Sequence, residues 1–188
     1  MALLILGLAL WWASHLYPIY LPARRAAAHR RLGEKLYKSA FSMFSVIAVA
    51  FMVMGYQKAG LIAVWTPPLW TTHLNNLLML VAIFLFITKF AKSGVRRQIR
   101  HPMLAGVKLW AVAHLLVNGD LASIVLFGGL LAWAVVAMIG SSRRDGAWQR
   151  PAGGGIAGLI RHGVIAVVVF LAIVGVHGLL FGVSTFPR

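Results

Sequence analysis

RHPMLAGVKLWAVAHLLVNGD, residues 100–120, is the stretch of sequence that decides the fold. It is apolar except at its ends and at Lys108 and His114. Its proline stands near the start, at the helix position where proline is favoured. Ionisable side chains at membrane depth are unfavourable, so they usually line a functional site. The stretch therefore predicts a membrane helix at 102–117 that carries functional side chains and ends in the turn Asn118-Gly119-Asp120.

The composition places this helix in an integral membrane protein. The chain has 188 residues, of which 61% are hydrophobic and 11% are charged, whereas about a quarter of the residues in a soluble domain are charged. Its length fits one helical domain, residues 1–188, and leaves no room for a separate soluble catalytic module. We therefore predict an all-α fold, a polytopic membrane bundle.

Apolar segments and basic loops alternate along the chain. Six segments are expected to span the membrane: 2–20, 39–56, 72–91, 102–117, 121–140 and 162–183. The fourth is short, because a bilayer core needs about 20 helical residues. The connecting segments 21–38, 92–102 and 141–161 are basic and the others are nearly neutral. By the positive-inside bias, this pattern predicts six transmembrane helices in a bacterial inner membrane with both termini periplasmic.

The excess of positive charge indicates which kinds of molecule the protein can bind. Lys and Arg number 18 against three carboxylates, a formal net charge of +15. In a soluble domain this excess would indicate nucleic acid, but here the basic residues flank apolar runs. They are expected to contact anionic lipid head groups, and no nucleic-acid binding is predicted.

The missing residue types restrict the chemistry further. The chain has no cysteine, which excludes disulfides, iron–sulfur clusters, a thiolate nucleophile and covalent haem attachment. Three carboxylates, Glu34, Asp120 and Asp145, are too few for a di-iron site or a paired-acid hydrolase. Histidine or a bound cofactor must therefore carry any chemistry.

The seven histidines fall into three groups. His29 and His101 lie at the edges of basic loops, and His73 and His162 at predicted span boundaries, where they are expected to be solvated or interfacial. Three lie inside apolar segments and need a partner: His15, His114 and His177. One hydrogen bond to a neighbouring helix would satisfy a neutral imidazole, so a purely structural role remains open for each.

Two of these histidines share a sequence context. Residues 10–16 and 109–115 both follow the pattern Leu-Trp-x-x-small-His-Leu, which places each tryptophan on the same helix face as its histidine. Two histidines on different helices, with small neighbours, could clamp a flat cofactor, and bis-histidine haem b is the familiar example. The predicted iron ligands are His15 and His114, with His177 in reserve. The other predicted cofactor contacts are Trp11, Trp110, Ala111, Arg100 and Lys108. Arg24 or Arg25 could also pair with haem propionates.

The segment from Arg100 to Leu116, together with Asn118-Gly119-Asp120, His15-Leu16 and Thr66-Pro67-Pro68-Leu69-Trp70, resembles the signature of the NnrU-type membrane proteins. The resemblance covers nearly the whole chain. That family is associated with denitrification, so it implies a role in nitrogen-oxide metabolism and partners among respiratory or nitrogen-oxide reductase proteins.

The NnrU-type family is similar in turn to the plant and cyanobacterial 15-cis-ζ-carotene isomerase, a haem b protein. Carried over by motif, the iron ligands of the isomerase correspond to His114 and His15. The isomerase has a cysteine near its second ligand, where this chain has Ala111. A switch to thiolate ligation is therefore excluded, which weighs against isomerase activity. A haem-dependent isomerase of a lipophilic polyene and a haem-free assembly protein remain the alternatives.

Overall fold

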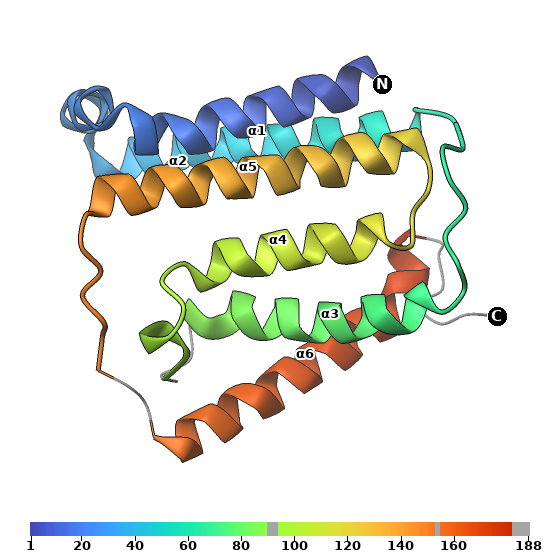
Figure 1. Ribbon diagram of the computed structural model, residues 1–188. Helices are drawn as coiled ribbons and strands as arrows, with labels where there is room; N and C mark the ends of the chain where they lie inside the picture. Colours follow the sequence, from blue (N-terminus) through green and yellow to red (C-terminus); the bar gives the residue numbers. More distant parts are fainter. Residues whose placement is uncertain (90–93, 153–154, 182–188) are drawn as a thin grey trace. The chain divides into compact units, whose positions relative to one another are not determined.

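The structure is a computed structural model that describes residues 1–89, 94–152 and 155–181. Its regular elements in these ranges are helices (Figure 1). The six α-helices and two short 3-10 helices are α1 Ala2–Tyr20, α2 Pro22–Gln57, α3 Thr71–Phe86, η1 Ile87–Lys89, η2 Gly94–Arg97, α4 Pro102–Leu115, α5 Leu121–Asp145 and α6 Ile156–Phe181. The predicted all-helical membrane fold is confirmed.

The α-helices differ in whether they are long enough to cross a bilayer. Four are long and apolar enough to do so: α1, α2, α5 and α6. α3 has 16 residues and α4 has 14, which at 1.5 Å per residue is about 24 Å and 21 Å, less than the roughly 30 Å of a hydrocarbon core. The shortness of α4 agrees with its sequence. That α3 and α4 cross the membrane stays a prediction.

The chain divides into two compact units, which we describe separately. Unit 1 consists of Met1–Val64 and Asp120–Gly146 and contains α1, α2 and α5. Unit 2 consists of Trp65–Gly119 and Ala147–Arg188 and contains α3, α4 and α6. His15 therefore belongs to unit 1 and His114 to unit 2.

Glycines let the helices of unit 1 approach one another closely. A Cβ atom added to Gly7 of α1 would lie 2.6 Å from the backbone nitrogen of Met52 on α2, and one added to Gly55 would meet the α1 backbone at Leu4. On α5, a Cβ at Gly129 would lie 3.0 Å from the Leu8 side chain, whereas one at Gly128 would meet nothing within 4 Å. Of the Gly128-Gly129 pair, only Gly129 is thus used in close packing.

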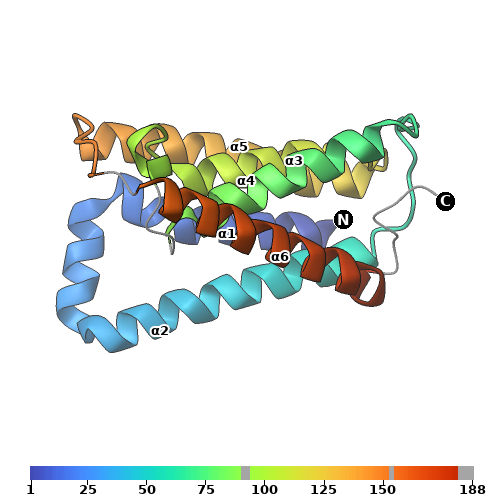
Figure 2. The same cartoon turned by 90° about the horizontal axis from the view of Figure 1, so that it is seen from below.

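The basic segment 21–38 is helical, so its prediction as a loop was wrong. α2 begins at Pro22, and these residues are helical on both sides of a kink at Gly33. The segment is rich in Ala, Arg, Leu and Lys, which favour helix even where the sequence is too polar to be membrane-embedded. Gly33 has φ 72° and ψ 165°, a conformation outside the helical region, and α2 bends sharply in its first half (Figure 2).

In unit 2, α3 packs against both α4 and α6. On the α4 side, a Cβ at Gly106 would lie 2.9 Å from the Ala82 carbonyl oxygen. On the α6 side, the His162 Nε2 donates a hydrogen bond of 2.8 Å to the Phe84 carbonyl. The imidazole also stacks on the Phe84 ring, with 4.1 Å between ring centroids and 10° between planes. His162 is fully buried, so its prediction as an interfacial residue was wrong.

Several predicted boundaries also move. α6 begins at Ile156 rather than 162, because residues 156–160 are apolar enough to continue the helix, and Arg161 lies inside it. α5 continues to Asp145 rather than 140, and the α-helical part of α3 ends at Phe86 rather than 91. Lys92, Gly153, Gly154 and the end of the predicted sixth span, 182–183, lie outside the described residues.

The turn after α4 lies at Leu116 and Val117, earlier than the predicted Asn118-Gly119-Asp120, and Asp120 is the residue that caps α5. The Asp120 carboxylate caps α5 by accepting a 2.9 Å hydrogen bond from the Ser123 backbone N–H. The Ser123 hydroxyl also donates to this carboxylate, and it lies 2.8 Å from the Tyr56 hydroxyl at the end of α2. This polar cluster ties the end of α2 to the start of α5 within unit 1.

Candidate functional site

His15 on α1 is held by the carbonyl of the residue one turn earlier. Its Nδ1 lies 3.1 Å from the Trp11 carbonyl oxygen. A carbonyl can only accept a hydrogen bond, so Nδ1 carries the proton and donates it. The Ser14 hydroxyl, 3.0 Å from the same nitrogen, also donates to the Trp11 carbonyl. This tautomer leaves the lone pair on Nε2.

Three aromatic rings surround the His15 imidazole. The Trp11 ring stacks on it, with 3.8 Å between centroids and 23° between planes. Trp133 on α5 meets it edge-on at 5.5 Å, and Phe41 on α2 lies tilted at 5.0 Å. All three helices of unit 1 therefore contribute to the surroundings of His15, and Trp11 lies on the same helix face as His15, as their spacing predicts.

Two indole groups beside His15 lack an acceptor. The Nε1 atoms of Trp11 and Trp133 are buried, and neither has a hydrogen-bond partner within residues 1–89, 94–152 and 155–181. Trp133 is only 7% exposed. By contrast, the Trp12 Nε1 donates to the Gly129 carbonyl at 3.1 Å. A buried donor without a partner costs about 1–3 kcal/mol, and a bound group with an oxygen acceptor would remove that cost.

His114 on α4 repeats the arrangement in unit 2. Its Nδ1 donates to the Trp110 carbonyl oxygen at 2.9 Å, so Nε2 again carries the lone pair. The Trp110 and His114 rings lie 5.1 Å apart at 51°. Ala111 and Ala113, the small neighbours on α4, are fully buried.

Helix geometry explains why the same histidine–carbonyl hydrogen bond occurs in both α1 and α4. Side chains lean toward the helix N-terminus, so a histidine ring can reach a carbonyl in the preceding turn. A histidine that binds a metal usually donates its other ring N–H to a carbonyl or carboxylate, which fixes its tautomer and orientation. His15 and His114 match that arrangement, whereas His162 donates through Nε2 instead.

The other predicted cofactor contacts lie on or just before α4, and the reserve ligand lies on α6. Lys108 lies within α4 and is half-buried, and Arg100, also half-buried, stands two residues before that helix. His177, the reserve ligand, is half-buried on α6. Of the predicted tryptophans, Trp11 lies beside His15 in unit 1 and Trp110 lies beside His114 in unit 2.

Trp133 and Phe41 are the site residues that sequence reasoning missed. Trp133 belongs to the run Leu130-Leu131-Ala132-Trp133-Ala134, which looks like any lipid-facing or core segment. Nothing in the local pattern distinguishes it, because its contact with His15 is made across 118 residues of chain. The missing hydrogen-bond acceptor of its indole is visible only in three dimensions.

His15 and His114 do not belong to a larger cluster of metal-ligating side chains in the described residues. Within the placed parts of the chain, no group of three or more histidine, cysteine, aspartate or glutamate side chains could hold a metal ion. Haem iron needs fewer protein donors, because the porphyrin supplies four nitrogens and one or two axial ligands complete the shell. The two Nδ1-anchored imidazoles and the unpaired indole donors beside one of them fit such a group.

Comparison with known proteins identifies the family. The sequence model of the family described as NnrU protein matches residues 3–185, nearly the whole chain. No curated protein and no solved structure matches significantly. The chain therefore belongs to the NnrU family.

Proposed function

We propose that this NnrU-family membrane protein binds haem b and that the imidazoles of His15 and His114 are the iron ligands. One observation carries the proposal. In both α1 and α4, the histidine Nδ1 donates to the carbonyl of the tryptophan four residues earlier, which leaves Nε2 as the nitrogen for a metal.

The chain's own residues would serve this cofactor in distinct ways. Trp11, Trp133 and Phe41 surround His15 with aromatic rings, and the indole N–H groups of the two tryptophans could donate to an oxygen of the bound group. In the surroundings of His114 we assign Trp110 and Ala111 to contact with the macrocycle, and Arg100 and Lys108 to its carboxylates. When bound, haem supplies one-electron chemistry. With no cysteine in the chain, ligation by a thiolate is excluded.

The spectrum of the detergent-purified protein tests the ligands. We expect a low-spin haem spectrum, and loss of haem or a high-spin spectrum in His15→Gly and in His114→Gly. Added imidazole should restore the low-spin spectrum in both, because it can enter the space left by the ring. His73→Gly, at an exposed position on α3, is the control and should leave the spectrum unchanged.

Two results would refute the proposal. One is an unaltered low-spin spectrum with full haem in both ligand variants. The other is a folded wild-type protein that takes up no stoichiometric hemin, which would favour a haem-free assembly role.

We further propose that this centre acts in nitrogen-oxide metabolism, alongside respiratory or nitrogen-oxide reductase proteins. The support is family membership. Deletion of the gene should slow the consumption of nitrite or nitric oxide by the host, and the wild-type allele should restore it. If a His15→Gly allele that binds no haem also restored consumption, the role in nitrogen-oxide metabolism would not require haem.

A further inference from the structure

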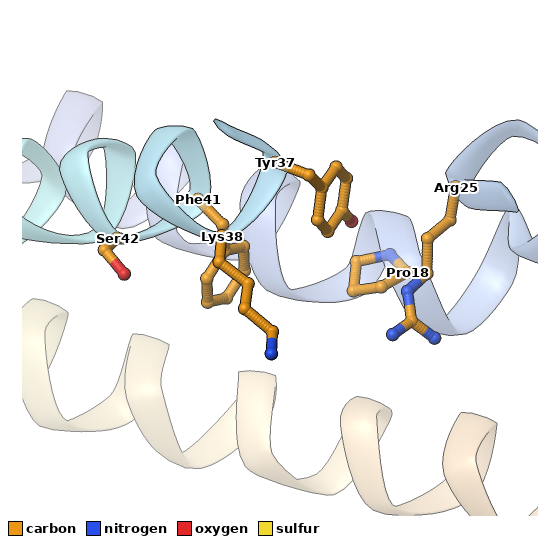
Figure 3. Close-up of a pocket in the computed structure, with 6 residues that line it drawn as sticks. All are labelled: Pro18, Arg25, Tyr37, Lys38, Phe41 and Ser42. Atoms are coloured by element: carbon orange, nitrogen blue, oxygen red, sulfur yellow. The ribbon is translucent and has the colours of Figure 1, made fainter. Parts of the chain in front are cut away.

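A pocket of about 330 Å³ lies in unit 1 where α1 ends and the first half of α2 begins. Its lining combines two cationic and two hydroxyl side chains with two apolar ones: Arg25, Lys38, Tyr37, Ser42, Pro18 and Phe41. In Figure 3 the Arg25 guanidinium, the Lys38 ammonium group and the Ser42 hydroxyl extend to the same side of the ribbon. The pocket lining therefore offers several hydrogen-bond donors and contains no carboxylate.

The two cations differ in how far they are already neutralised. Arg25 has no carboxylate partner in the described part of the chain. Lys38 is paired with Glu34 one turn earlier on α2. The hydrogen bond from Lys38, followed by its charge, lowers the pKa of the Glu34 carboxyl, so Glu34 stays ionised at neutral pH. Both partners are mostly exposed, 70% and 64%, and such a pair is weak enough for another anion to compete with it.

The sequence places the pocket at the border of the membrane. Residues 39–57 of α2 contain no charged side chain, so Lys38 is the last charge before the apolar half of the helix. The neighbouring end of α1, at Tyr20, is also where its apolar run stops. Lipid phosphates lie at this level. Beyond the pocket, α2 exposes apolar side chains that suit acyl chains: Met43, Phe44 and Val46.

We infer that this pocket binds the head group of an anionic phospholipid. Arg25 and Lys38 bind the phosphate oxygens, and the hydroxyls of Tyr37 and Ser42 donate further hydrogen bonds. The acyl chains lie along the exposed apolar face of α2. The inference rests on neither the haem nor its ligands, although Phe41 borders both the pocket and the His15 ring.

Native mass spectrometry of the full-length protein with added phosphatidylglycerol or phosphatidylcholine tests the site. The double variant Arg25→Gln/Lys38→Gln should bind phosphatidylglycerol about fivefold to thirtyfold more weakly, from one to two interactions of about 1 kcal/mol each. The matched control is Arg30→Gln/Arg31→Gln, which removes the same charge from exposed positions of the same helix outside the pocket. It should bind like the wild type. Glu34→Gln should bind more tightly, because it frees Lys38.

Several outcomes would overturn the inference. If the pocket variant and the control lost the same affinity for phosphatidylglycerol, the lipid would be attracted by the overall charge of the basic segment and not by the pocket. Equal binding of the two lipids, or displacement of the lipid by excess inorganic phosphate, would mean that no anionic lipid is selected. Loss of lipid when hemin is added would assign the pocket to a haem propionate. Circular dichroism and melting curves of both variants must match the wild type, as expected for exposed substitutions.

Discussion

At the scale of single residues, the histidines differ in the nitrogen that each one offers. His15 and His114 donate through Nδ1 to a carbonyl of their own helix, whereas His162 donates through Nε2 to the Phe84 carbonyl on another helix. Spacing in the sequence predicts the first type, because i and i+4 neighbours are fixed by helix geometry. It cannot predict the second, because Phe84 is 78 residues away. The imidazole of His162 thus joins two helices of unit 2, whereas His15 and His114 each bind a carbonyl of their own helix through Nδ1.

His162→Ala should therefore destabilise the protein without changing any cofactor spectrum. The change removes a buried hydrogen bond and leaves a cavity beside Phe84, at a cost of about 2–4 kcal/mol. Denaturant or thermal unfolding of the purified protein would measure it, with His73→Ala as the exposed control within about 0.5 kcal/mol of the wild type. An unchanged melting curve would show that the Phe84 contact contributes nothing, and haem loss from folded protein would make His162 a ligand.

At the scale of helices, glycine positions determine how closely α1 lies against α2. Gly128 and Gly129 are adjacent in α5, but only Gly129 meets a neighbour, and Gly7 and Gly55 carry the close backbone contacts between α1 and α2. A glycine in an apolar helix signals that close contact is allowed, not which face receives it. The face depends on the partner helix, which local sequence does not specify.

Gly55→Ala should lower stability by about 1–3 kcal/mol, because its methyl group would press on the α1 backbone at Leu4 and packed backbones cannot yield without strain. Gly128→Ala is the matched control, since a Cβ there meets nothing within 4 Å, and it should be neutral or slightly stabilising. Unfolding of the two variants side by side gives the comparison. A Gly55→Ala protein as stable as Gly128→Ala would contradict the close packing of α1 on α2.

The basic segment of α2 shows where charge patterning misleads. Its charges predict that residues 22–38 lie outside the membrane core, but an aqueous environment does not imply a loop. Helix propensity and Pro22 at the first helical position make the segment helical, and Gly33 supplies the bend. Hydropathy reports the environment of a segment, and its backbone conformation requires separate evidence.

At the scale of the whole molecule, the sequence predicts the number of helices. It does not by itself determine how many of them cross the membrane. The six apolar segments become six α-helices because each is bounded by charges, proline or glycine in the sequence. Length then separates four candidates for full crossing from α3 and α4. A boundary error of a few residues suffices to move a helix between these classes, as the early end of α3 illustrates.

Labelling of single cysteines introduced into this cysteine-free chain should settle the crossings. We expect Lys58→Cys and Asn118→Cys to react from the outer side, and Arg31→Cys and Arg143→Cys only after permeabilisation. Asn118 is preferable to Gly119, where a Cβ would collide with the Trp65 carbonyl. Outer labelling at Lys58 with inner labelling at Asn118 would show that only one of α3 and α4 crosses.

The division into two units also has a consequence for how the protein is made. Unit 1 is discontinuous: α1 and α2 emerge first, but α5 follows only after α3 and α4. At about 5–20 residues per second, the ribosome needs roughly 3–13 s to pass from Gln57 to Leu121. Throughout that interval the indole of Trp133 and the Gly129 face are absent from the membrane, so α1 and α2 wait with His15 only partly enclosed. The nascent hairpin of α1 and α2 therefore has His15 in place before the Trp133 ring that packs against it has been made.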